Sequence, residues 1–361
     1  MQQWQWTRRR WAARVYAGVC AGVWAGVWAG VWAGVWAGAV GTIGAMALWA
    51  SPVAAQEKVK FNLSWLPQGS TGGVLVAINK GYYREAGLEV SAIVGHGGQR
   101  TVNEVDQGLF EFGYGDPISV MLNRAQGGKT KMVGSINTVW PGAICYLAKP
   151  GRKIAGPADL KGMSMGGGGA SPLQNIVPAW LQANGLPPTS IKLLRLDPST
   201  INPSFLQGRV DLTECWEGAN LPVLKSLAAK QGREIGSLRY RDFGLDMVGN
   251  GIVTTEKMIE QKPDVVRRFV QATYRGYAWM RDNPEASAGV IASQYPMLDK
   301  QVMVEQIRQI GALEGDRETK GHKPGWLPVP RMEATARFVR EAFHLAPTLK
   351  ATDIYTNQFV E

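Results

Sequence analysis

Short apolar segments that end in glycine-rich turns recur along the first half of the chain. Residues 58–65, 88–94 and 110–114 are rich in β-branched and aromatic side chains, which predicts strands. Each segment is followed by glycine or small polar residues, and then by a stretch with the apolar spacing of a helix. This alternation of strand and helix is typical of an open parallel sheet covered by helices.

A second series of the same kind begins after the breaker Lys149-Pro150-Gly151. It holds a predicted helix at about 173–184. The further strands predicted along the chain are 131–136, 143–148, 191–196, 209–216 and 251–254. The C-terminal third is predicted to be helical, because Pro263-Asp264 suits a helix start and apolar residues recur at helical spacing from Val266 to Met280.

The two series predict an α/β fold with two lobes. The chain crosses to the second lobe near 148–151 and returns near 249–254, and two such crossings are typical of a hinge. We therefore assign residues 56–148 together with 251–361 to lobe 1, and residues 149–250 to lobe 2.

Residues 1–55 have the character of a targeting segment. They hold four arginines and no acid, and the sequence Ala-Gly-Val-Trp occurs four times between Ala21 and Trp36. Val53-Ala54-Ala55 offers small residues for signal-peptidase cleavage, so we predict export. Because the apolar stretch could span a bilayer, an uncleaved N-terminal membrane anchor is the alternative. The sequence does not choose between the general secretory and the twin-arginine routes.

Charge and histidine content exclude several kinds of partner. The net charge is +10, but no run of five basic residues occurs, so we expect no nucleic-acid binding. The three histidines, His96, His322 and His344, are widely spaced, so we expect no metal site. Residues 123–130 lack the first glycine of a phosphate-binding loop, and Gly95–Gly98 lacks the third glycine of a dinucleotide fingerprint. We therefore predict no cofactor.

The mature chain has two cysteines, Cys145 and Cys215. Two cysteines are too few for a disulfide framework of the kind found in small exported proteins. We expect two buried free thiols, with a single bridge between them as the alternative.

One motif raises an enzymatic alternative. Residues 162–166 match G-x-S-x-G, the nucleophile elbow of α/β-hydrolases, which needs an apolar strand directly before the serine. A polar turn precedes Ser164 instead, so we expect Ser164 to lie within a strand. Neither His322 nor His344 has a recognisable catalytic setting. We predict no catalytic residue, and an exported serine hydrolase that uses Ser164 is the remote alternative.

Four turns, at 68–73, 95–98, 115–117 and 166–171, place glycine and small polar residues where a predicted strand ends and a helix begins. In open parallel sheets, ligands bind at this edge. Ser171-Pro172 suits an N-cap followed by a first-turn proline, with free backbone N–H groups at the helix start. We therefore predict a binding site at these turns.

The order of several short motifs resembles the periplasmic solute-binding proteins of ABC importers, in the branch for thiamine-pyrimidine precursors, nitrate, sulfonates and taurine. The motifs are Trp65-Leu66-Pro67, Gly81–Val90, Gly113–Asp116, Asp159–Gly162, Gly208–Asp211 and Lys262–Phe269. The resemblance implies a two-lobed type II periplasmic-binding-protein fold with two hinge crossings. It also implies that the lobes close on a small molecule in the periplasm and deliver it to a membrane permease. It implies binding rather than catalysis, and we expect a monomer.

The predicted cleft edges carry aromatic, acidic and small polar side chains. The ligand-binding residues we predict are Trp65, Gln68, Asp116, Trp140, Ser171, Trp216 and Glu217. Tyr114 and Glu214 are further candidates.

The side chains at these edges favour a flat ring over a bare anion. Burying ~150 Å² of a flat ring supplies ~4 kcal/mol, of the ~8 kcal/mol that micromolar binding needs. Carboxylates repel an anion but accept hydrogen bonds from amino and ring N–H groups. We therefore expect a small planar heterocyclic or aromatic solute, with a substituted pyrimidine first. A small organic anion (sulfonate, taurine, nitrate or aromatic carboxylate) is the alternative.

Overall fold

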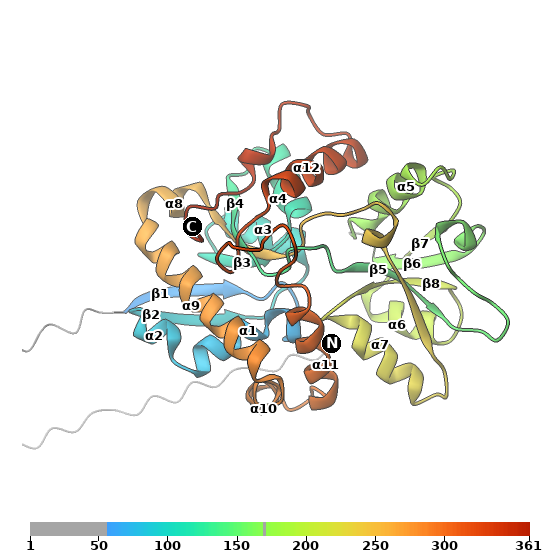
Figure 1. Cartoon of the computed structure of the whole chain (residues 1–361), viewed down its shortest axis with the longest axis horizontal. Coiled ribbons are helices and arrows are strands. Elements are labelled where there is room, and N and C mark those ends of the chain that lie inside the picture. Colours follow the sequence, from blue (N-terminus) through green and yellow to red (C-terminus); the bar gives the residue numbers. More distant parts are fainter. Residues whose placement is uncertain (1–55, 169–170) are drawn as a thin grey trace, which may run out of the picture. The chain divides into compact units, whose positions relative to one another are not determined.

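Two five-stranded mixed sheets form the framework of the chain in its computed structural model (Figure 1). The structure describes residues 56–168 and 171–361. The predicted export signal lies outside these residues. No helix within them is long and apolar enough to cross a membrane.

The first sheet has the strand order β2-β1-β3-β10-β4. Its strands are β1 (Glu57–Asn62), β2 (Leu88–Ile93), β3 (Phe112–Gly115), β4 (Thr130–Ser135) and β10 (Gly251–Thr255). β1 pairs in parallel with β2 and β3, whereas β10 runs antiparallel between β3 and β4. The helices of this part are α1 (Gly69–Asn79), α2 (Tyr82–Glu85), α3 (Gly98–Asp106) and α4 (Pro117–Ala125).

The second sheet has the order β7-β6-β8-β5-β9. Its strands are β5 (Gly142–Leu147), β6 (Ser164–Gly168), β7 (Lys192–Leu196), β8 (Leu212–Trp216) and β9 (Ile235–Arg239). β6 pairs in parallel with β7 and β8, and β5 runs antiparallel between β8 and β9. The helices of this part are η1 (Pro157–Leu160), α5 (Leu173–Ala183), α6 (Pro198–Leu206), α7 (Asn220–Ala229) and η2 (Tyr240–Phe243).

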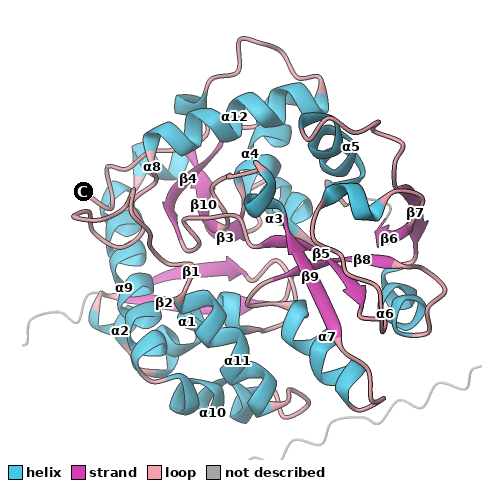
Figure 2. Cartoon of the chain, turned by 45° about the vertical axis from the view of Figure 1, so that its right-hand side comes forward, coloured by secondary structure: helices cyan, strands magenta, loops and turns pink. Residues whose placement is uncertain are grey.

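The C-terminal third is helical, as predicted, and its long helix α9 begins at Pro263. Its elements are α8 (Glu256–Gln261), α9 (Pro263–Asp282), α10 (Pro284–Gln294), α11 (Lys300–Gly311), α12 (Val329–Phe343) and η3 (Ala351–Asp353). α9 packs along α1. α12 packs on both α4 and α5, so it joins helices that belong to different sheets (Figure 2).

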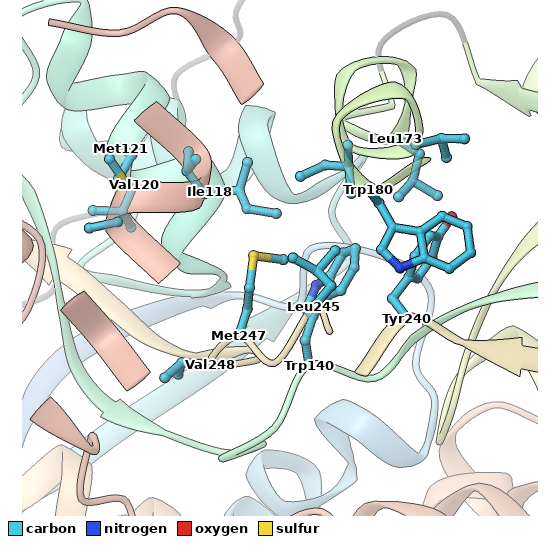
Figure 3. Packing of buried hydrophobic residues seen from close by; sticks show 14 of the residues in the cluster. Ile118, Val120, Met121, Trp140, Leu173, Trp180, Tyr240, Leu245, Met247 and Val248 are labelled. Carbon is cyan, nitrogen blue, oxygen red and sulfur yellow. The ribbon is translucent and has the colours of Figure 1, made fainter. Parts of the chain in front are cut away.

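The buried core forms around aromatic side chains on each side of the molecule. Beside the first sheet, the rings of Phe112 and Phe269 stack with their centroids 4.0 Å apart. Near the second sheet, Trp180 packs edge-on against Tyr240, which in turn contacts Trp140. Figure 3 shows the rings of Trp140, Trp180 and Tyr240 in one cluster with Ile118 of α4. This core therefore continues between the two sheets.

Two segments connect the sheets: the first connector, residues 136–141, and the second connector, residues 240–250. They are hydrogen-bonded to each other, for example from the Trp140 N–H to the Met247 carbonyl at 2.8 Å. The first crossing lies earlier than the predicted 148–151, because the strand predicted at 143–148 pairs within the second sheet. An apolar pattern alone does not say which sheet a strand joins. The return at β10 lies where the sequence predicts it.

Two glycine-rich segments predicted as turns are regular structure, which corrects the sequence interpretation. Gly69–Gly73 forms the beginning of α1, where Gly72 leaves room for Met280; a Cβ there would lie 2.7 Å from the Met280 sulfur. Gly166–Gly168 belongs to β6, and a Cβ at Gly166 would lie 2.7 Å from Leu196 Cδ1. Close packing by neighbouring side chains therefore explains glycine at Gly72 and Gly166.

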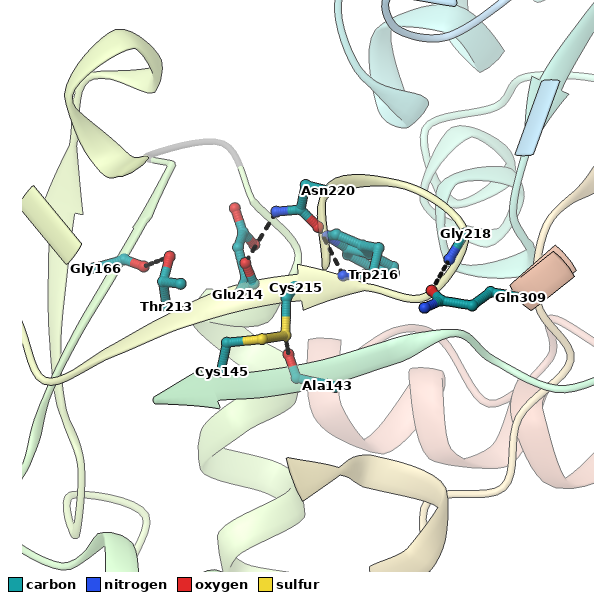
Figure 4. Close-up of a disulfide and its surroundings, with 10 residues drawn as sticks. All are labelled: Ala143, Cys145, Gly166, Thr213, Glu214, Cys215, Trp216, Gly218, Asn220 and Gln309. Carbon is teal, nitrogen blue, oxygen red and sulfur yellow. Dashed lines mark hydrogen bonds between the residues drawn. A yellow bond between two sulfur atoms is a disulfide. The ribbon is translucent and has the colours of Figure 1, made fainter. Parts of the chain in front are cut away.

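Cys145 and Cys215 form a disulfide between β5 and β8, so the prediction of two free thiols is wrong (Figure 4). The two cysteines are 70 residues apart in the sequence, and their Cα atoms are 5.8 Å apart. Antiparallel pairing of β5 with β8 brings them together, and that pairing leaves no local mark in the sequence.

Candidate ligand-binding site

Asp116 lies at the carboxyl end of β3, where the sequence predicts it, and it caps α4. Its carboxylate accepts hydrogen bonds from the Ser119 backbone N–H at 2.8 Å and from the Ser119 hydroxyl at 2.9 Å. Burial raises its pKa, although the bonds from Ser119 act in the opposite direction. Gly98 leaves space beside it, since a Cβ there would lie 2.9 Å from Asp116 Oδ2. Asp116 therefore has a structural task as an N-cap at the predicted edge.

The loop after β1 contains a residue that the sequence analysis missed. Ser64 is buried and has a φ of +66°, a left-handed conformation that costs a non-glycine residue about 1–2 kcal/mol. Its N–H donates to Asn62 Oδ1 at 2.9 Å, and its carbonyl accepts from the Gly97 N–H at 2.6 Å. The bond from Gly97 joins the loops after β1 and β2, and the bond to Asn62 fixes Ser64 within the first of them. No sequence pattern marks such a serine, because serine is common in any turn.

Trp65 and Gln68 lie on the same loop, between β1 and α1. The Trp65 side chain is 46% exposed, and Leu66 beside it is also exposed. Gln68 is half-buried and precedes α1, where its carbonyl accepts from the Thr71 hydroxyl at 3.3 Å. Trp65 is therefore accessible to a solute at this edge.

On the second sheet, β8 presents Glu214 and Trp216 on one face and Cys215 on the other, as alternation in a strand requires. Glu214 Oε2 accepts a hydrogen bond from the Ser171 hydroxyl at 2.7 Å. Desolvation raises the pKa of the half-buried Glu214, against bonds from Ser171 and the Gly168 backbone that lower it. Ser171 thus lies at the predicted site, although Pro172 rather than Ser171 is the N-cap of α5.

Aromatic rings lie beside this carboxyl. Trp140, in the first connector, is only 1% exposed and meets Trp216 edge-on with ring centroids 5.4 Å apart. Trp140 is therefore a buried residue on which the half-exposed Trp216 packs. Tyr240 is buried, and within the part of the chain that the structure describes its hydroxyl has no hydrogen-bond partner. Burial, followed by the nearby charge of Glu214, raises the pKa of Tyr240 well above its ordinary value.

Glu217 differs from Glu214 in its surroundings. Its carboxylate forms a two-pronged ion pair with the Arg241 guanidinium, one contact of which is 3.0 Å. Arg239 lies 4.0 Å from the same carboxylate. The predicted site included Glu217, with Glu214 as a further candidate, but it is Glu214 that is hydrogen-bonded to Ser171. Tyr240 was missed, because it follows β9 without any motif.

The first-sheet and second-sheet edges lie close together, since both contact the first connector. The Tyr114 hydroxyl, on β3, donates to Asn137 Oδ1 at 3.1 Å, and Asn137 precedes Trp140 by three residues. The Ser70 N–H at the start of α1 donates to the Gly218 carbonyl, just after β8, at 3.1 Å. The candidate ligand-binding site is the region bounded by Ser64, Trp65 and Asp116 on one side, and by Ser171, Glu214, Trp216 and Tyr240 on the other.

Several groups near this site that could bind an anion are already paired. At the start of α1, the Gly69 N–H donates to Gln306 Oε1 at 3.0 Å, and the Ser70 N–H is bonded to Gly218. Arg100, on α3, pairs with Glu104 at 2.7 Å and points largely to solvent. Within residues 56–168 and 171–361, no group of His, Cys, Asp or Glu side chains is arranged to hold a metal ion.

Two solved structures of periplasmic binding proteins have the same fold as this molecule. The alkanesulfonate-binding protein SsuA of Xanthomonas axonopodis pv. citri superposes with a TM-score of 0.62 at 16% identity, covering 84% of this chain and 98% of that protein. The periplasmic aliphatic sulphonate-binding protein SsuA of Escherichia coli gives 0.61 at 18% identity, covering 84% and 94%. The fold is therefore the α/β periplasmic-binding-protein fold, as expected.

The family follows from a sequence match. The model of the family described as "NMT1/THI5 like" matches residues 68–287, more than half of the chain, and the chain belongs to this family. The formylaminopyrimidine-binding protein of Halalkalibacterium halodurans is 25% identical over 244 residues, 67% of this chain and 72% of that protein. The riboflavin-binding protein RibY of Chloroflexus aurantiacus is 26% identical over 316 residues, 84% of this chain and 86% of that protein.

The matches confirm the resemblance found in the sequence. The chain is a solute-binding protein rather than an enzyme, in agreement with the names of these two relatives. Ser164 lies within β6, as predicted, and its hydroxyl donates to Asp211 Oδ2 at 2.8 Å. The serine hydrolase alternative is therefore wrong, since the family is one of binding proteins.

Proposed function

We propose that this chain captures a small planar nitrogen heterocycle between its two sheets and delivers it to the permease of an ABC importer. A substituted pyrimidine is the first candidate. Two relatives are named for formylaminopyrimidine and riboflavin, and both of these molecules are flat nitrogen heterocycles.

The proposal rests on the surroundings of the Glu214 carboxyl. Its carboxyl is half-buried beside Ser171 and Trp216, and among the residues that the structure describes it has no arginine partner of the kind that Glu217 has. A carboxyl in such a setting accepts hydrogen bonds from an amino group and a ring N–H, and it donates one when it is protonated. The Trp216 ring beside it offers a flat apolar surface, and stacking on it contributes about 1 kcal/mol beyond area burial.

Binding of an organic anion has less support. The sulfonate-binding structures share the fold with this chain at 16% and 18% identity, which says nothing of its ligand. At the candidate site, the first N–H groups of α1 are bonded to Gln306 and Gly218, and Arg241 is bonded to Glu217. An anion would have to displace these partners, and it would meet the carboxyls of Asp116 and Glu214.

We further propose that the chain works in the periplasm as a monomer and that its lobes close about the two connectors. The charged and apolar segments of residues 1–55 favour export. The connectors are the two chain segments that pass between the sheets, which suits them to a hinge.

The proposal is tested by calorimetric titration of the purified chain with formylaminopyrimidine, riboflavin, taurine and nitrate. We expect binding of a heterocycle, and a loss of about 10- to 100-fold in affinity for Glu214→Gln, because hydrogen bonds to charged groups contribute about 1.5–3 kcal/mol. Glu234→Gln is the matched control, since Glu234 is exposed on the second sheet at the start of β9. Taurine or nitrate binding without heterocycle binding would reverse the two candidates, and unchanged affinity in Glu214→Gln would remove Glu214 from the site.

A further inference from the structure

The loop after β8, residues 217–219, is attached to the opposite side of the candidate site by hydrogen bonds of its own backbone groups. The Gly218 carbonyl accepts from the Ser70 N–H at 3.1 Å. The Gly218 N–H donates to Gln309 Oε1 at 2.8 Å, a bond drawn in Figure 4. The Ala219 carbonyl accepts from Gln306 Nε2 at 2.6 Å. Three bonds therefore join the end of a second-sheet strand to α1 and α11.

Gln306 is the centre of this contact. It is 4% exposed, and its amide uses both ends: Oε1 accepts from the Gly69 N–H at 3.0 Å, while Nε2 donates to Ala219. The two backbone partners fix the orientation of the amide, because an N–H needs the oxygen and a carbonyl needs the NH₂ group. Among side chains of this length, only glutamine offers an acceptor and two donors at neutral pH.

Gly218 fits this contact for two independent reasons. Its φ is +70°, in the left-handed region that favours glycine. A Cβ at this position would also collide with Ile310 Cδ1 on α11. The loop therefore rests directly on α11, with no side chain between them.

We propose that Gln306 and Gln309, which we call the glutamine clamp, are positioning residues for the ligand-binding site. By holding Gly218 and Ala219 against α1 and α11, they fix the end of β8, and with it Trp216 and Glu214, opposite the first-sheet edge. The clamp consists of protein groups alone, so the inference goes beyond the proposed function and does not depend on which ligand binds.

A single substitution separates the two tasks of Gln306. In Gln306→Glu, the carboxylate still accepts from the Gly69 N–H, and a negative charge is favourable at a helix N-terminus. The same carboxylate cannot donate to the Ala219 carbonyl and repels it. Gln306→Leu removes both bonds with similar volume. Gln301→Glu, on the exposed side of α11, is the matched control.

The effect of the clamp is measured by residue-resolved amide hydrogen exchange, followed by NMR on the full chain without added solute. In Gln306→Glu at pH 7, we expect the protection of Ser70 and Gly218 to fall about tenfold, the effect of losing one hydrogen bond, while Gly69 stays protected. In Gln306→Leu, all three amides lose protection. Gln301→Glu leaves all three unchanged.

A pH profile distinguishes the clamp from a general loss of stability. As the pH falls through the pKa of the carboxyl in Gln306→Glu, this carboxyl takes up a proton and can donate again, so protection of Gly218 recovers. Gln306→Leu shows no such recovery. The charged groups nearest to the clamp are Glu305, which accepts from Gln309, Arg308, which pairs with Glu285, and Glu217, which pairs with Arg241. These groups are also present in the unsubstituted chain. Its own dependence of amide protection on pH is therefore the reference for the variants.

The proposal is overturned if Gln306→Glu is folded and the protection of Ser70 and Gly218 equals that of the unsubstituted chain at pH 7. If the Gln306 variants do not fold, Gln309→Leu provides the test. Gln309 is half-buried, and Gln309→Leu removes its bonds to the Gly218 N–H and to the exposed Glu305 but leaves Gln306 in place, so protection of Gly218 must fall while that of Gly69 is kept.

Discussion

Burial changes the chemistry of a single carboxyl outside the candidate site, that of Glu314. Glu314 comes three residues after the end of α11, and its side chain is only 16% exposed. Oε2 pairs with Arg281 at 2.9 Å, whereas Oε1 has no hydrogen-bond partner among the residues that the structure describes. Desolvation by burial raises the pKa of Glu314 from 4.5 to about 7, although Arg281 acts in the opposite direction. Glu314 therefore titrates close to neutral pH.

This carboxyl makes the stability of the chain depend on pH. Because the folded pKa of about 7 exceeds the ordinary value of 4.5, the stabilising contribution of Glu314 is fully present below pH 4.5 and is lost as the pH rises through 7. We expect Glu314→Gln to have a higher free energy of unfolding than the unsubstituted chain at pH 8, by up to about 3 kcal/mol. The difference shrinks toward pH 5.

Urea denaturation at several pH values measures this difference. Glu341→Gln, a substitution of an exposed carboxyl on α12, is the control and should show no such dependence. Stability curves of Glu314→Gln and the unsubstituted chain that run parallel from pH 5 to pH 8 would show that Glu314 has an ordinary pKa.

Single residues of the site were only partly predictable from the sequence. Asp116, Ser171 and Trp216 lie at the predicted edges, because turn residues after a strand mark the edge of a sheet. Glu217 was chosen over Glu214, although the alternation of side chains along β8 puts Glu214 on the same face as Trp216. Tyr240 depends on packing between distant segments and has no local signal.

At the scale of elements, the disulfide joins the two strands at the middle of the second sheet. It lies on the face of β8 opposite to Glu214 and Trp216, in a core with residues of α6 and α7. It closes a loop of 70 residues in the unfolded chain, and bridges of this kind stabilise proteins by about 2–4 kcal/mol.

We expect reduction of the disulfide to lower the melting temperature by several degrees, as a loss of about 2–4 kcal/mol requires in a chain of this size. Differential scanning calorimetry with and without a thiol reductant makes the measurement. The Cys145→Ala, Cys215→Ala double variant should melt at the lower temperature in both conditions. Equal melting temperatures of the oxidised and reduced chain would contradict a stabilising bridge.

Strands and long helices were predicted well because each has its own period of apolar residues. β7, β8, α5 and α9 agree with prediction to within a few residues. The start of α1 was read as a turn because glycine is a poor helix former. In the structure, Met280 and Tyr277 pack closely on Gly72 and Gly73, and this tertiary packing outweighs the local preference.

At the scale of the whole molecule, the two connectors act as one unit. Besides the bond between Trp140 and Met247, the N–H groups of Ile136 and Asn137 donate to the Asn250 carbonyl at 2.8 and 2.9 Å. The buried Arg331 of α12 bonds to the Thr138 carbonyl at 3.1 Å and pairs with Asp246 at 3.2 Å. The two connectors, which carry the chain between the sheets, are therefore bonded to each other and to α12.

The fold class and the family could be predicted from the order of short motifs, because each motif belongs to a different βα unit. The place of the first crossing and the disulfide could not, since both depend on which strands pair. The glutamine clamp was not predictable either, because Gly218 and Gln309 are 91 residues apart.

Native mass spectrometry of the purified chain, incubated with equal amounts of formylaminopyrimidine, riboflavin, taurine and an alkanesulfonate, tests the central claim most directly. We predict one bound molecule per chain, with the mass of a heterocycle. A complex that holds only taurine or the sulfonate would contradict the account, and so would a chain that retains none of the four.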